Sequence, residues 1–151
     1  MRKVQTTMRS ILLALALLSV FVVGACSSSG DDGIEVVDPW GRTSPKVAAN
    51  GAFYMVLNGG GSDDVLIAAD ADVCGTTELH QTTMSDGVMS MQQVEGGIEI
   101  PADGQAVLEP GGLHVMCINK ADEFEVGDII PLTLTFENAG SQTVDAEIRE
   151  G

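Results

Sequence analysis

The feature that most restricts this chain is that residues 34–150 hold no long segment with the 3.6-residue period of a helix. Apolar runs are short, and Gly, Asp, Asn or Pro separates them. The run at 132–136, Leu-Thr-Leu-Thr-Phe, alternates apolar and polar residues as a half-buried strand does. We therefore expect an all-β sandwich or small barrel, with strands near residues 34–37, 51–57, 65–68, 76–81, 88–94, 106–108, 113–118, 129–137 and 143–148.

The N-terminus reads as an export signal. Arg2, Lys3 and Arg9 precede an apolar run at residues 11–23, which is shorter than the about 20 residues that span a bilayer. The following residues, Val-Gly-Ala-Cys ending at Cys26, resemble the lipobox of bacterial lipoproteins, in which the cysteine is lipidated and becomes the new N-terminus. The alternative is an ordinary secretory signal, which would leave Cys26 as a free thiol.

These observations divide the chain into three parts. We expect a lipoprotein signal peptide at residues 1–25, a lipidated cysteine with a flexible tether at 26–33, and one domain at 34–151. Acyl chains on Cys26 would anchor the protein to the cell membrane without a membrane span. The domain would then lie outside the cytoplasm, where thiols tend to be oxidised.

Charge excludes one class of partner. The chain has 22 acidic and 7 basic residues, a formal net charge of -15, so phosphate backbones would repel it and nucleic-acid binding is not expected. Hydrophobic residues make up 44% of the chain, which argues against a disordered acidic protein. The acidic residues match no calcium-binding loop. We therefore interpret them as part of the solvated surface; they are Asp63, Asp64, Asp70, Asp72 and Glu78.

Soft metal ligands gather in the middle of the chain. The two histidines are His80 and His114, and Met116 follows His114 at the spacing that shares one face of a strand. Met89 and Met91 have the same spacing. Thioether and imidazole together suit Cu(I), whereas calcium and magnesium need oxygen ligands. The alternative is that methionines fill gaps in a core, as we expect for Met55.

Three blocks of the sequence make this reading more specific, because together they resemble the PCu(A)C family of periplasmic copper chaperones over about residues 34–148. The blocks are residues 38–45 with 51–58, then Glu78-Leu79-His80 with Met91, then residues 110–116 with 127–128 and 132–136. The resemblance implies a cupredoxin-like Greek-key β-sandwich. It also implies one Cu(I) near the surface, bound by His80, Met91, His114 and Met116.

The resemblance further implies a carrier rather than an enzyme. Its cargo would be Cu(I), and its partner a respiratory cytochrome oxidase subunit or another copper chaperone. Met84 and Met89 are not among the implied ligands, but Met89 remains a candidate substitute because it shares the strand face of Met91. The sequence has no nucleophile-elbow pattern, and two histidines offer little acid–base machinery.

Two cysteines follow Cys26. Cys74 and Cys117 form an even pair in an oxidising compartment and are candidates for a disulfide, which requires their Cα atoms to lie about 4.4–6.8 Å apart. On a regular strand Cys117 faces away from His114. A blue-copper electron-transfer protein would instead need a thiolate ligand. A third reading is a metal-free surface lipoprotein that binds other proteins.

The aromatic residues are expected to be structural. Aromatic side chains dominate the buried surface of small domains. We therefore predict that Trp40 and one of Phe53 or Tyr54 fill the core.

Overall fold

The computed structural model describes residues 33–151 of the chain. The predicted signal peptide, the predicted lipidation site Cys26 and nearly all of the predicted tether lie outside the described residues. Within residues 33–151 there is no helix long and apolar enough to cross a bilayer.

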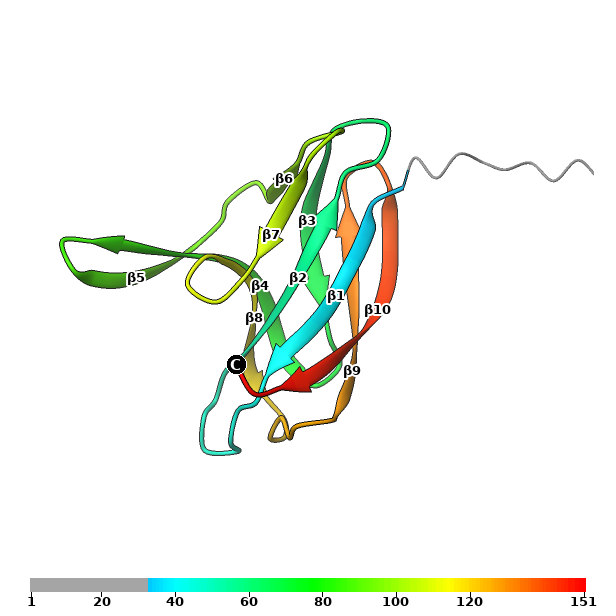
Figure 1. Ribbon diagram of the computed structural model, residues 1–151. Coiled ribbons are helices and arrows are strands. Elements are labelled where there is room, and N and C mark those ends of the chain that lie inside the picture. Colours follow the sequence, from blue (N-terminus) through cyan, green and yellow to red (C-terminus); the bar gives the residue numbers. More distant parts are fainter. Residues whose placement is uncertain (1–32) are drawn as a thin grey trace, which may run out of the picture.

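The described residues form ten strands, and the predicted all-β class is confirmed (Figure 1). Each of the nine predicted strands corresponds to one of them, and only the three-residue β6 was missed, because Ile98-Glu99-Ile100 is too short to establish a period. The strands are β1 (Glu35–Arg42), β2 (Gly51–Asn58), β3 (Asp64–Asp70), β4 (Cys74–Ser85), β5 (Val88–Gln93), β6 (Ile98–Ile100), β7 (Gln105–Leu108), β8 (Leu113–Lys120), β9 (Ile129–Phe136) and β10 (Gly140–Arg149).

Hydrogen bonds link the strands in the order β5-β4-β8-β7-β2-β1-β10-β9-β3-β6, with a further pairing of β8 and β2. β1 runs antiparallel to β2 and parallel to β10. It therefore joins two halves of the sheet, one with β5, β4, β8, β7 and β2 and the other with β10, β9, β3 and β6. Buried residues from both halves form one hydrophobic cluster, because the sheet folds back on itself as a sandwich. The hydroxyl of Thr77 in β4 donates to the carbonyl of Ala69 in β3, which links the two halves again.

The core follows the alternation read from the sequence. In β9 every second residue is buried, namely Ile130, Leu132, Leu134 and Phe136. Phe53 of β2 has no exposed surface and lies 5.6 Å from Phe124, measured between ring centroids. Met55 is 2% exposed, which confirms it as a core residue.

The prediction for Trp40 was wrong. Its side chain is only half-buried and contacts Tyr54 on the outer face, with ring centroids 4.7 Å apart. The cause is a β-bulge between Val37 and Trp40, where Asp38 has a φ of 49°. An extra residue reverses the alternation of a strand, so Gly41 rather than Trp40 faces the core against Phe53.

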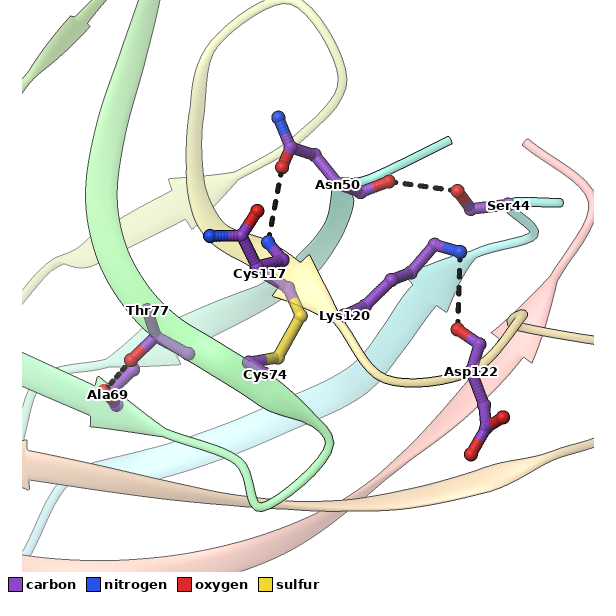
Figure 2. Close-up of a disulfide and its surroundings, with 9 residues drawn as sticks. Ser44, Asn50, Ala69, Cys74, Thr77, Cys117, Lys120 and Asp122 are labelled. Atoms are coloured by element: carbon purple, nitrogen blue, oxygen red, sulfur yellow. Dashed lines mark hydrogen bonds between the residues drawn. A yellow bond between two sulfur atoms is a disulfide. The ribbon is translucent and has the colours of Figure 1, made fainter. Parts of the chain in front are cut away.

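A disulfide ties β4 to β8 (Figure 2). Cys74 and Cys117 are bonded, with their Cα atoms 5.4 Å apart. Cys117 has no exposed surface and belongs to the core cluster. The bond therefore fixes these two strands from the core side.

Asp64 is not the solvated residue that its sequence context suggested. It is 5% exposed, and its carboxylate accepts hydrogen bonds from the backbone N–H groups of Val65, Asn138 and Ala139. Burial alone would raise the pKa of Asp64, but these backbone donors outweigh it and hold the pKa below its ordinary value. Asp64 thus anchors the β9–β10 turn to the start of β3.

The hairpin of β4 and β5 differs from the rest of the sandwich. β4 continues past the body of the domain, and β5 returns beside it as an arm (Figure 1). All six residues of β5 are exposed. We call residues 82–93 the β4–β5 arm.

Candidate metal centre

The pairing of β4 with β8 brings the two histidines together. His80 lies directly opposite His114, and their ring centroids are 5.8 Å apart. Two positions along the same strands, Glu78 lies opposite Met116. Opposed residues and residues two apart share one face of a sheet, so both histidines and Met116 face away from the core, whereas Val115 and Cys117 face into it.

Met91 reaches this face from the neighbouring strand. It lies opposite Thr82, which is two residues beyond His80 on β4. Met91 lines one cleft of about 400 Å³ together with His114 and Met116. The remaining residues of the cleft are Arg42, Ala52, Tyr54, Thr82, Met89, Pro110 and Gly111.

The structure thus places the four predicted ligands on one face, and three of them in one cleft. His80 does not line the cleft itself but lies beside His114 beneath it, with its side chain 15% exposed. Met91 is 54% exposed on the β4–β5 arm. Met89, the candidate substitute, also lines the cleft and is 59% exposed.

The surroundings of His114 leave one ring nitrogen free. Its Nδ1–H donates to the carbonyl oxygen of Gly112 at 3.1 Å, so Nε2 is the nitrogen with an available lone pair. The residue is 4% exposed. Burial lowers the pKa of His114 and nearby His80 acts in the same direction, against the Gly112 contact. A neutral imidazole of this kind is the form that binds metals.

His80 contacts the carboxylate of Glu78, which was predicted from the sequence to belong to the solvated surface. Its Nε2 lies 2.8 Å from Oε2 of half-buried Glu78. Its Nδ1 is buried and has no hydrogen-bond partner within the described residues. The two residues are two apart on a strand, so the rule that placed Met116 beside His114 could also have identified this contact.

An aromatic pair, Tyr54 and Trp40, lies beside the histidines, and Tyr54 lines the cleft. Tyr54 lies 6.3 Å from His114 between ring centroids, and Trp40 packs against Tyr54. Burial raises the pKa of Tyr54, although the charge of Arg42 opposes this shift. No sequence pattern indicates this aromatic pair, because the bulge in β1 is what turns Trp40 outward.

The chemistry of the available donors is soft. Within residues 33–151 no three side chains of His, Cys, Asp or Glu are grouped closely enough to hold a metal ion. The described cysteines are bonded to each other and offer no thiolate, so the blue-copper reading lacks its ligand. The cleft offers imidazole nitrogen and thioether sulfur, which suit a soft monovalent ion such as Cu(I).

Comparison with known proteins identifies relatives over nearly the whole described domain. A family model described as "Putative lipoprotein LpqE-like" matches residues 34–148. "Putative lipoprotein Lxx21020" of Leifsonia xyli subsp. xyli (strain CTCB07) is 29% identical over 150 residues, which cover 96% of this chain and 88% of that protein.

Solved structures share the fold. The "Apo PCuAC domain from PmoF1" is 26% identical with a TM-score of 0.65, and the match covers 78% of this chain and 94% of that one. The "Solution structure of CuI-DR1885 from Deinococcus Radiodurans" is 25% identical with a TM-score of 0.64, covering 82% and 84%. The resemblance to PCuAC domains that the sequence indicated is confirmed.

Proposed function

This chain belongs to the LpqE-like family, and we propose that it is an extracytoplasmic carrier of Cu(I). It holds one ion at the cleft through His80, Met91, His114 and Met116. It is anchored to the cell membrane by lipid on Cys26. As the sequence resemblance implies, it delivers copper to the copper sites of cytochrome oxidase or to another copper chaperone.

One observation carries the proposal. The hairpin of β4 and β5 and the more distant β8 present imidazole and thioether groups on one face, with the two histidine rings 5.8 Å apart. His114 lines the cleft with Nε2 free of the Gly112 contact, and Met91 lines it as an exposed residue. The similar DR1885 domain was solved as a CuI form, which supports the same cargo here.

The donor set explains how a carrier can hold and release its ion. Thioether and neutral imidazole ligands favour Cu(I) over Cu(II). A thioether has no proton to lose, so binding through methionine does not depend on deprotonation. The arm leaves Met91 exposed, so a stronger ligand of a partner can replace this thioether first.

A competition titration tests the cargo and the ligands together. Protein beginning at Ser27 is titrated with Cu(I) against a colorimetric Cu(I) chelator, beside His80→Ala, His114→Ala and the double variant His114→Ala/Met116→Ala. We expect one Cu(I) per parent chain and no competitive binding by the double variant. Ile129→Ala on β9 is a matched control, because it removes an exposed apolar side chain outside the cleft.

Two results would overturn the assignment. The ligand set is wrong if the double variant binds Cu(I) as tightly as the parent. The metal-free alternative gains support if the protein does not compete with the chelator for Cu(I) and if added Cu(I) does not raise its melting temperature, because an ion that binds the native state must stabilise it.

The anchor is tested separately. Cys26→Ser removes the proposed lipidation site, so we expect the protein to move from the membrane fraction to the soluble extracytoplasmic fraction. Retention of Cys26→Ser in the membrane fraction would show that the lipid on this cysteine is not what holds the protein there.

A further inference from the structure

We propose that the β4–β5 arm carries a second soft-metal site, formed by the thioethers of Met84, Met89 and Met91, from which an ion passes inward to His114. This inference rests on the proposed function, because it concerns the route by which Cu(I) reaches the cleft. It assigns a role to Met84 and Met89, which are not among the four proposed ligands.

The strand register brings the three sulfur atoms within reach of one ion. Met84 on β4 lies directly opposite Met89 on β5, and Met91 follows Met89 on the same face. Directly opposed residues have Cβ atoms about 4.5–5.5 Å apart, and diagonal neighbours about 7–8 Å. Methionine is unbranched with three rotatable bonds, so its sulfur can close these separations.

Packing does not account for these side chains. Met84 is 67% exposed, Met89 59% and Met91 54%, although methionine is usually among the more buried residue types. Apolar side chains gain stability from leaving water, and these three have gained little. Three thioethers on one exposed face form a donor set that binds soft ions and leaves hard ones in water.

The arm site is continuous with the cleft. Met89 and Met91 both line the cleft that holds His114 and Met116. Met91 therefore belongs to both donor sets and can stay bound while the others change. The ion exchanges the sulfur atoms of Met84 and Met89 for ring nitrogens of His80 and His114 and the sulfur of Met116, and its oxidation state and the protonation of the ligands do not change.

The experiment follows each methionine directly. Protein beginning at Ser27 and labelled with carbon-13 at the methionine methyl groups is titrated with Ag(I), a soft monovalent ion without redox chemistry at the cleft. We expect the first equivalent to shift the methyl signals of Met91 and Met116. A second equivalent should shift those of Met84 and Met89 and bind more weakly, because Met91 is by then bound to the first ion.

Two variants separate the sites. Met84→Leu/Met89→Leu keeps similar side-chain volumes, and we expect it to retain the first equivalent and lose the second. His114→Ala/Met116→Ala should lose the first equivalent and still shift the signals of Met84 and Met89. Val88→Leu is the matched control, because it changes an equally exposed residue of the arm that has no sulfur.

The outcomes distinguish this inference from the proposed function. The arm site is wrong if the signals of Met84 and Met89 do not shift, or if the double leucine variant binds two equivalents as the parent does. If those signals shift but the His114 and Met116 substitutions leave the first equivalent unchanged, the arm site stands and the proposed cleft site fails.

Discussion

Two methionines in this domain show how differently one residue type is used in its two regions. Met55 in β2 is 2% exposed and packs in the core, whereas Met89 on the β4–β5 arm is 59% exposed. The first supports the fold by filling space, and the second contributes little burial. The sandwich therefore supplies the stability, and the arm is free to present side chains selected for their chemistry.

The largest expected difference in stability is between variants in which Met55 or Met89 is truncated to alanine. Met55→Ala removes a buried side chain and should lower the free energy of unfolding by about 2–5 kcal/mol. Met89→Ala should change it by less than about 0.5 kcal/mol, because surface substitutions rarely do more. Chemical denaturation of both variants measures the difference, and similar losses would remove the distinction between the two regions.

Removing the disulfide tests how much the covalent link between β4 and β8 contributes to stability. Replacing Cys74 and Cys117 together by Ala should lower the free energy of unfolding by about 2–4 kcal/mol, because the bond restricts the unfolded chain. Denaturation of the parent with and without a reducing agent checks the value independently. An unchanged unfolding midpoint in the double variant would show that packing alone fixes β4 against β8.

Asp64 allows the stability of the sandwich to be tested as a function of pH. Asp64→Asn should cost about 1–3 kcal/mol at neutral pH, because buried backbone donors lose their charged acceptor. The pKa of Asp64 is lowered in the folded protein, so its contribution is present above the unfolded pKa of about 3.9 and is lost as pH falls through the folded pKa.

Denaturation at a series of pH values measures this dependence. The stabilities of parent and Asp64→Asn should converge below about pH 4, whereas exposed Asp72→Asn should track the parent throughout. A difference that persists in acid would mean that Asp64 acts through packing rather than through its charge.

The smallest expected effect is a difference in amide hydrogen exchange between the arm and the core of the unaltered protein. Backbone amides of β5 should exchange with deuterium faster than those of β9, because exposed segments with few buried contacts open at little free-energy cost. Hydrogen exchange followed by mass spectrometry compares the two strands. Equal protection would indicate that the arm is as firmly held as the core.

Most of the fold could be predicted from local patterns, and each error of prediction has a specific structural cause. The alternation at 132–136 identified β9 because one face is buried and the other is wet. Trp40 was misplaced because a single inserted residue reverses the strand, and no period reveals a bulge. Asp64 was misread because its donors come from Asn138 and Ala139, far along the chain.

The site, like the fold, could be predicted only in part from the sequence. That His114 and Met116 share a face follows from strand geometry alone. That His80 lies opposite His114 depends on the register of β4 against β8, and only the family resemblance suggested it in advance. The contact of Glu78 with His80 was accessible to the two-residue rule, but the excess of acidic residues made it look like ordinary surface.

The buried Nδ1 of His80 has one more consequence. A buried polar atom that has no hydrogen-bond partner among the described residues carries an energetic penalty of about 1–3 kcal/mol in the folded protein. An ion that bound this nitrogen would not have to strip water from it, and would relieve the penalty instead. Part of the driving force for capture would then be stored when the chain folds, before the ion arrives.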